Sequence, residues 1–534
     1  MSAWQLKPLS RQMAIVSCGL ALTCLTLASS VMANDTIGYQ KTFVPANLPD
    51  QFRNDVVSLD KKSFAQLVLL RNPDVLITQA QRDIAQQQLR FDQGAYETEF
   101  FANLRASDKQ TDNRGSIRTD VPLLINRQSG FDFGVRKLVR SGAEITVDYQ
   151  GIRTSDNTPT SLDLGLQDSK GALNFSIRQP LMRGIGAAQV EGRIAQAEIQ
   201  IAVSEKEIRQ QLLSKTFDAL SLYWRLYREE QILTLNTNSL SNARKILADT
   251  ERMVNAGRLP QTALTEAKSM VVLREAESFS IQQGYTQVTN AIMSLLNIPS
   301  SEQIIRFETQ SEPDTSAWIL PESFDDYYEQ VLKTWPNYEI AQQRIAIEQQ
   351  GLLMAQDELK PRLDLVMGYG QTGRRYQTKS FGGPFNDSFK DDYPNWNMAL
   401  ELSMPIGGNE SARARQEIAL TRIAQNQLQA DAVRVELANQ LSTRLQQVTQ
   451  SHEEMKRHAE NVQMLSELLT IERDRYDRGM SRLMDVIDRE DNYNMAVVRL
   501  LDSQIRFELA KATLQLSDGS LLNDLNINFD VDLL

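Results

Sequence analysis

The sequence contains two copies of one unit, and this duplication limits the folds that it can adopt. A stretch that begins at Pro73 aligns with a stretch that begins at Pro336, at a constant offset of 263. A second offset of 222 relates two heptad series, which end just before Gly257 and Gly479. The heptad positions are Ala219, Leu226, Leu233, Leu240, Leu247 and Val254 in one copy, and Leu441, Val448, Met455, Val462, Leu469 and Tyr476 in the other. Each copy takes up about half of the chain, as in proteins built from repeats.

The segment 1–33 has the pattern of a secretory signal peptide. Lys7 and Arg11 precede an apolar stretch over residues 13–27, and the small residue Ala33 provides a cleavage site. Both cysteines, Cys18 and Cys24, lie in this leader, so the mature chain would have neither disulfides nor thiolate metal ligands. Cleavage before Cys18, as in a lipoprotein, is less favoured because it would leave an apolar stretch on the mature chain.

Charge and composition argue against several classes of protein. Without the signal peptide, 55 basic residues (57 minus 2) face 68 acidic ones, a net charge of −13. Nucleic-acid binding is therefore not expected, because it needs a basic surface. Beyond the leader, no apolar run reaches the roughly 18 residues of a membrane-spanning helix. The chain has no P-loop motif, and its two histidines, His452 and His458, do not form a zinc-binding pair, so we expect no enzyme activity, cofactor or metal site.

Each copy is predicted to run from a short helix through strands into a very long helix and then a second short helix. The strands are expected within 97–181 and 362–405. Their clearest alternation places Ile145, Val147 and Tyr149 on one face and polar residues on the other. Strands of about ten residues with one apolar and one polar face are typical of a barrel in a bilayer. The same alternation could face the core of a soluble sandwich, so the pattern alone leaves both possibilities open.

Long helices are predicted over about 188–256 and 409–478. The chain must turn from strand into helix before each of them, at Pro180 and Gly184 and at Pro405 and Gly407. At 1.5 Å per residue each helix would extend roughly 100 Å, so it must pack on other helices along its length. A strict heptad seam indicates left-handed supercoiling, and the wide polar remainder favours the wall of a hollow bundle.

The predicted organisation has six parts and one irregularity. The parts are the signal peptide 1–33, an extended segment 34–57, the first repeat 58–297, a connector 298–321, the second repeat 322–516 and a tail 517–534. In the first repeat the strand region is about twice as long as in the second, and 130–153 reads as an extra hairpin that turns at Ser141 and Gly142. This hairpin could enlarge the outer loops or the barrel, and the loop interpretation is favoured.

Two phrases, together with the order of elements, resemble TolC-like outer-membrane efflux proteins. The phrases are Gln-Pro-Leu-Met-Arg-Gly at 179–184 and Tyr-Asp-Arg-Gly-Met-Ser-Arg-Leu-Met-Asp-Val-Ile-Asp at 476–488. The resemblance implies a mainly helical homotrimer in which each protomer contributes about four strands to a shared transmembrane β-barrel in the outer membrane. The helices would form a hollow cylinder across the periplasm, whose tips dock onto a periplasmic adaptor and an inner-membrane transporter. No cofactor would be needed.

A physical argument leads to a similar picture without the resemblance. One chain supplies too few strands to close a barrel with a lumen, and open sheet edges cannot exist in hydrocarbon. Copies must therefore close the barrel together by cyclic symmetry. The number three comes from the resemblance alone.

The helical turns at Gly257 and Gly479 would form the periplasmic tip, where the adaptor docks. In the family, carboxylates after the second turn line the entrance, and here Asp485 and Asp488 occupy those positions. They share a helix face, so three protomers would place six carboxylates around one axis and attract cations. The alternative is that acidic residues there only favour the helix N-terminus.

The resemblance also assigns polar links that hold the entrance closed. Tyr476 matches a tyrosine that makes one such link, and Thr262 stands where the pattern expects it. Ala263 replaces an acidic partner, and Ser481 replaces an arginine. Arg482 lies one residue further and points elsewhere by about 100°. The closed state is therefore expected to be held differently.

The sequence thus predicts a passive exit channel of a tripartite efflux or type I secretion system. The alternative from another class is a coiled-coil protein that spaces envelope layers without conducting. The alternating strands argue against it.

Overall fold

The computed structural model describes residues 56–112, 122–157, 167–299, 306–316, 318–376, 381–390 and 394–527. The chain divides into two units, Met1–Ala46 and Asn47–Leu534, and every described residue belongs to the second. The predicted signal peptide with its two cysteines, nearly all of the extended segment 34–57 and the end of the tail lie outside the described residues.

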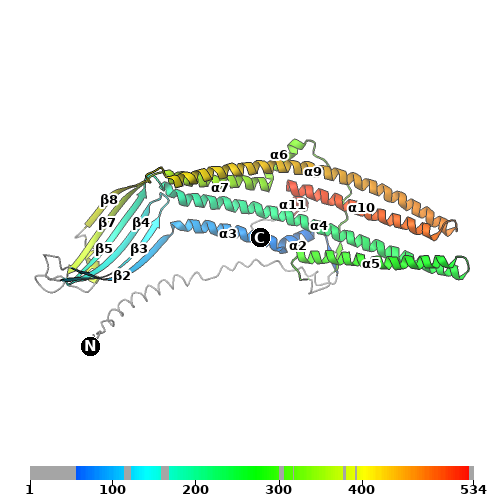
Figure 1. Cartoon of the computed structure of the whole chain (residues 1–534), viewed down its shortest axis with the longest axis horizontal. Helices are drawn as coiled ribbons and strands as arrows, with labels where there is room; N and C mark the ends of the chain where they lie inside the picture. The colour runs from blue at the N-terminus through cyan, green and yellow to red at the C-terminus, as the bar shows by residue number, and fades with distance from the viewer. Residues whose placement is uncertain are drawn as a thin grey trace, which may run out of the picture. The chain divides into compact units, whose positions relative to one another are not determined.

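Within this second unit, helices and strands follow the predicted order twice (Figure 1). The helices of the first copy are α2 (Lys61–Arg71), α3 (Pro73–Gln93), α4 (Ala188–Asn255) and α5 (Gln261–Leu295). Those of the second are α6 (Phe324–Thr334), α7 (Pro336–Leu359), α9 (Glu410–Asp477) and α10 (Leu483–Asp518), followed by α11 (Leu521–Asp524). The strands are β1 (Val56–Leu59), β2 (Thr98–Asp112), β3 (Leu123–Leu138), β4 (Glu144–Asp156), β5 (Gln167–Pro180), β6 (Arg306–Thr309), β7 (Arg362–Tyr376) and β8 (Pro394–Ser403).

The helices recur at the offsets found in the sequence. The short helices α2 and α3 reappear as α6 and α7 at the larger offset, and the pair α4 and α5 reappears as α9 and α10 at the smaller one. The two long helices both contain 68 residues. The first copy is therefore longer than the second only between its short and long helices, where its additional strands lie.

Matching residues begin the short helices of both copies. The Asp60 side chain accepts a hydrogen bond from the Lys62 backbone N–H (3.1 Å) at the start of α2. Ser323 has the same role in α6, where its hydroxyl accepts from the Asp326 N–H at 3.3 Å. Helices α3 and α7 both begin with a proline, whose fixed φ suits the first helical position.

Six strands form one antiparallel sheet in the order β2-β3-β4-β5-β7-β8. The predicted extra hairpin exists as β3 and β4, and it turns at Ser141 and Gly142, where Gly142 has φ +86°. The favoured interpretation, that it would enlarge the outer loops, is wrong. The additional residues supply two long strands that pair along the full sheet, and the hairpin turn lies at the end of the sheet next to α4.

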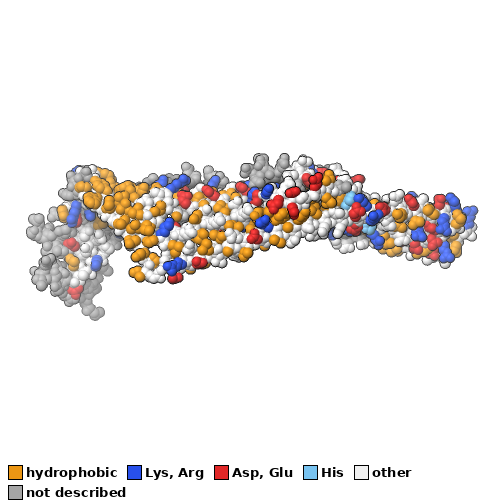
Figure 2. All heavy atoms as spheres, turned by 90° about the horizontal axis from the view of Figure 1, so that it is seen from above, with side chains coloured by type: hydrophobic (Ala, Val, Ile, Leu, Met, Phe, Trp, Pro, Cys, Tyr) orange, Lys and Arg blue, Asp and Glu red, His pale blue; other side chains and the backbone are white. Residues whose placement is uncertain are grey.

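The sheet has one apolar and one polar face. Cross-strand partners form a row on the apolar face, namely Phe100, Val135, Val147, Phe175, Tyr369 and Trp396. All six side chains are at least 37% exposed, and Trp396 is 77% exposed. The opposite face carries ion pairs such as Arg136–Glu99 (2.7 Å) and Arg178–Glu401 (2.7 Å). Figure 2 shows hydrophobic side chains gathered at the strand end and mixed charges at the helical end.

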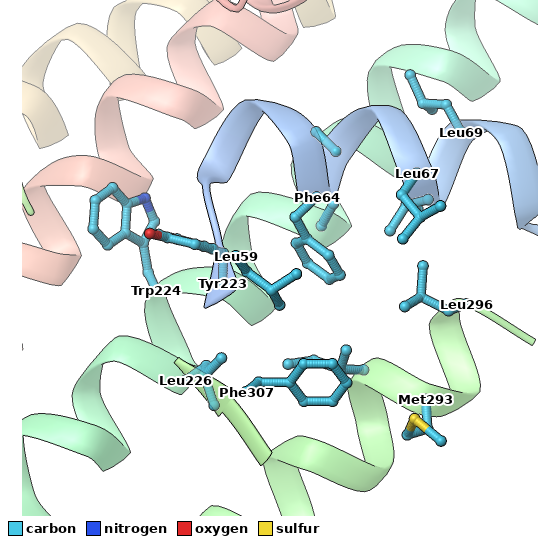
Figure 3. Close-up of a cluster of buried hydrophobic side chains, with 14 of the residues drawn as sticks. Leu59, Phe64, Leu67, Leu69, Tyr223, Trp224, Leu226, Met293, Leu296 and Phe307 are labelled. Carbon is cyan, nitrogen blue, oxygen red and sulfur yellow. The ribbon is translucent and has the colours of Figure 1, made fainter. Parts of the chain in front are cut away.

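The main core lies midway along the helices, where the connector crosses them (Figure 3). Phe64, Trp224 and Phe307 are at most 1% exposed there. Strand β6 of the connector pairs in parallel with β1, and the Tyr285 hydroxyl donates to the Phe307 carbonyl at 2.7 Å. In the tail, Leu521 of α11 is buried against α4 and α10. In the described parts of the chain, no helix has the length and apolar character needed to cross a membrane.

Candidate gate at the helical tips

Two turns with the same geometry join the long helices to their partners. Gly257 follows α4 with φ +71°, and Gly479 follows α9 with φ +73°. The Gly479 N–H donates to the Tyr476 carbonyl (2.9 Å) and the Met480 N–H to the Arg475 carbonyl (2.8 Å). The turn at Gly257 repeats both bonds, so each is a Schellman motif, which needs a left-handed residue after the helix. The two glycines therefore end the long helices at equivalent positions.

Behind the turns, α4, α5 and α10 share a small apolar cluster. Its buried members are Ala243, Ala267, Met270, Val271, Leu483 and Ile487. Tyr476 is half-buried and packs on the edge of this cluster. The cluster thus connects the two helical hairpins within one chain.

Both predicted entrance carboxylates are exposed on the first turns of α10. Asp485 also has a local structural role, because its carboxylate accepts a hydrogen bond from the Arg482 backbone N–H at 3.2 Å. An acidic residue in this position stabilises the helix start. No such contact is present for Asp488 in the described part of the chain, so its carboxylate is the one without a local role.

Ser481 and Arg482 have different surroundings. The Ser481 hydroxyl donates to Glu472 of α9, a residue that is only 9% exposed. Ser481, which stands where the resemblance to TolC-like proteins expects an arginine, therefore links the turn to α9, the helix that precedes the turn. Arg482 is exposed and begins α10 as its N-cap residue.

In the first hairpin, the polar side chain predicted at the tip faces solvent. Thr262 is exposed in the first turn of α5, and the next residue, Ala263, is 9% exposed. A carboxylate at the Ala263 position would be largely buried and costly to desolvate. The alanine therefore suits the packing of this hairpin.

A buried polar link between the hairpins was not predicted from the sequence. Arg274 of α5 reaches Asp491 of α10 and also donates to Glu277 at 2.9 Å. Its side chain is 9% exposed. Within the second hairpin, Arg473 of α9 lies 3.3 Å from Glu490 of α10, whose side chain is 4% exposed. The sequence signal would have been a charged residue on the apolar face of a helix.

The strand-to-helix turns lie at the opposite end of these helices. Pro180 ends β5, and Gly184 (φ +88°) donates its N–H to the Asp357 carboxylate at 2.8 Å. Pro405 and Gly407 (φ +118°) precede α9, and an added Cβ at Gly407 would meet nothing within 4 Å. These turns redirect the chain from the sheet into the long helices α4 and α9.

Both histidines lie on α9 and contact other side chains of the helices. The ring of His452 packs 4.8 Å from that of Phe507, and His458 lies 3.5 Å from Glu454. Among the described residues, no group of three or more His, Cys, Asp or Glu side chains could hold a metal ion.

Comparisons with known proteins identify the architecture. A family model described as "Outer membrane efflux protein" matches residues 327–520. The fold is similar to that of CusC (TM-score 0.63, 15% identity, covering 90% of this chain and 98% of that one). It is also similar to the CmeC outer membrane channel of Campylobacter jejuni (0.61, 12%, 93% and 96%) and to the outer membrane protein VceC of Vibrio cholerae (0.60, 14%, 86% and 96%). No curated protein sequence matches the chain.

Proposed function

Since the family model and the fold both confirm the resemblance to TolC-like outer-membrane efflux proteins, we propose that this chain forms the exit channel of a tripartite efflux or type I secretion system. The channel is a homotrimer in the outer membrane. Its helical tips receive cargo from a periplasmic adaptor and an inner-membrane transporter, and it conducts passively.

The observation that supports this proposal best is the sheet with two open edges. Strands β2 and β8 each pair on one side only within the described residues, and both are exposed along their length. Unpaired backbone groups are excluded from hydrocarbon, so each edge needs a partner strand. The sheet has six strands of alternating direction, so β8 of one copy meets β2 of the next in antiparallel orientation. A ring of copies can therefore close with every pair of neighbouring strands antiparallel.

The apolar face has the height of a membrane's hydrocarbon layer. Counted along β7, its cross-strand rows extend from that of Leu363 to that of Gly373, in which Phe131 and Leu104 are the apolar members, and these ten residue steps correspond to about 34 Å along the strand. At a tilt of about 40°, typical of membrane barrels, the height is about 26 Å. Outer-membrane barrels have an apolar band of about 25 Å.

The additional hairpin makes the proposed barrel wide. Three copies of the six described strands give 18 strands. At a strand spacing of about 4.8 Å and the same tilt, the backbone radius is about 18 Å, compared with about 12 Å for 12 strands. Barrels of 16–18 strands enclose an aqueous channel. We therefore place the narrowest point at the helical tips.

At the tips, Asp485 and Asp488 of three protomers form a ring of carboxylates that binds cations. Asp488 contributes most to it, since Asp485 is partly engaged by the backbone of Arg482. Tyr476, Thr262 and Arg482 lie beside this ring and contact the neighbouring hairpins. The turns at Gly257 and Gly479 contact the adaptor.

Planar-bilayer recording of the purified protein tests this function. We expect stable channels, which trivalent cations block from the periplasmic side. Replacing Asp488 with asparagine should weaken the block more than replacing Asp485. A protein that remains monomeric in detergent and conducts no current would contradict the channel, whereas normal conductance with unchanged block in both variants would contradict only the gate.

A further inference from the structure

One arginine on the apolar face of the sheet forms no ion pair with any of the residues that the structure describes. Arg153 of β4 lies in the same cross-strand row as Ser169 and Arg375, just beyond the last apolar row. Its guanidinium lies 4.4 Å from the centre of the Phe381 ring. Its Nε is buried and has no hydrogen-bond partner. A cation at the border of an apolar surface is stabilised by a nearby anion, and the described part of the chain places none beside Arg153.

Beside Arg153, a short helix lies on the apolar face. Helix α8 (Gly382–Asp387) follows β7. Strand β7 ends at the side of the sheet away from the long helices (Figure 1). Ser388, fully buried, accepts the Gly373 N–H (3.2 Å) and donates to the Pro384 carbonyl (2.7 Å). Glycines at positions 171 and 373 leave room for the helix, because an added Cβ at either would contact Pro384. The position of α8 is thus fixed by the sheet.

The surface around α8 combines aromatic rings with excess positive charge. Phe385 packs on Tyr149 with ring centres 4.9 Å apart, yet is 44% exposed, and Phe389 is 55% exposed. Asp387 accepts from Arg375 at 2.6 and 3.1 Å and from Lys390 at 2.9 Å.

Arg375 and Lys390 share the single carboxylate of Asp387, and Arg153 lies against the Phe381 ring with no ion pair among the described residues. The nearby Asp168 pairs with Arg374, whose side chain projects from the other face of β7. The surface around Arg153 is therefore positive.

We propose that Arg153, Arg375 and Lys390 bind the phosphate of an anionic lipid head group in the outer leaflet, while Phe385 and Phe389 contact the apolar part of the same lipid. The inference rests on the proposed function, which directs the apolar face toward lipid. Guanidinium groups bind phosphate with two parallel hydrogen bonds, and aromatic residues gather where a barrel meets the head groups. Arg153, which has no ion pair within the described ranges, lies at this level.

Lipid binding to the purified full-length trimer tests this site. The probes are bisphosphorylated lipid A, the same lipid without its phosphates, and inorganic phosphate, with bound lipid counted by native mass spectrometry. We expect Arg153→Gln and Arg375→Gln each to weaken lipid A binding about 5-fold and the double variant about 25-fold. Arg374→Gln is the matched control and should bind like the wild type.

Three results would overturn the proposal. Arg153→Gln could bind lipid A with unchanged affinity, the dephosphorylated lipid could bind equally well, or inorganic phosphate could compete at similar concentrations, which would indicate a site for free anions. Conductance and trimer mass are measured on the same samples. Loss of the lipid effect with normal conductance refutes only this site, whereas absence of conductance refutes the channel itself.

Discussion

The bond between Arg274 and Asp491 offers the sharpest test of how the two hairpins are held together. It joins α5 to α10 across 217 residues of sequence, and the arginine is 9% exposed while the aspartate is 36% exposed. At about 4 Å and an effective dielectric constant of about 20, two such charges attract by about 4 kcal/mol. Desolvation offsets part of this attraction, so we expect a net coupling of about 2 kcal/mol.

A double-mutant cycle measures this coupling. The variants are Arg274→Met, Asp491→Asn and their combination, and the measurement is native-state hydrogen exchange of the α10 amides beyond Asp491. Each single substitution should accelerate exchange about 30-fold, which corresponds to about 2 kcal/mol of local opening free energy. The double variant should be little faster than either single one, because the interaction is already lost.

Arg244→Met provides the control, since Arg244 pairs with Glu275 within one hairpin and both side chains are exposed, at 60% and 44%. Its effect should remain below about 0.5 kcal/mol. Additive effects of the two substitutions in the cycle, or wild-type exchange in Arg274→Met, would show that the bond does not hold the hairpins together.

Three further outcomes are expected. Burial raises the pKa of the Glu230 carboxyl, so the stability that its protonated form provides is present below about pH 4 and is lost as the pH rises through the raised pKa. Glu230→Gln should therefore gain melting temperature over the wild type as the pH increases from 4 to 8. A difference in melting temperature that stays constant with pH would contradict this. Gly142→Ala should destabilise more than Gly257→Ala, because both have positive φ but only at Gly142 would a Cβ press on backbone, 3.0 Å from the Ala187 nitrogen. Equal melting temperatures of these two variants would refute the steric reasoning. Trp224→Ala should cost about 3–5 kcal/mol in denaturant unfolding, since this side chain is 1% exposed in the main core, and a cost under 1 kcal/mol would argue against that core.

Periodic features of the chain could be predicted from the sequence alone. The heptad positions from Ala219 to Val254 and from Leu441 to Tyr476 are all buried or half-buried, because a seam repeated every seven residues can only face other helices. The glycines that end the long helices could be located because the left-handed conformation after a helix strongly favours glycine. Local chemistry is sufficient in both cases.

Contacts between distant segments could not be predicted in the same way. Arg274 lies on the apolar face of α5, but this pattern does not identify Asp491 as its partner, and only the packing of α5, α4 and α10 brings the two residues together. The same holds for α8, whose position on the sheet depends on glycines in two other strands. The hairpin β3–β4 was recognised, but alternation within a strand does not tell whether the strand joins a neighbouring sheet or extends a loop.

In the proposed barrel, the even number of strands that each chain contributes limits how the width of the barrel can change during evolution. A single inserted strand would reverse the direction of every strand after it and leave like directions facing each other where copies meet. Only whole hairpins preserve closure, so a threefold assembly can widen only in steps of six strands. In the proposed trimer, the extra hairpin that distinguishes the first repeat from the second would be one such step, made in a single copy of the duplicated unit.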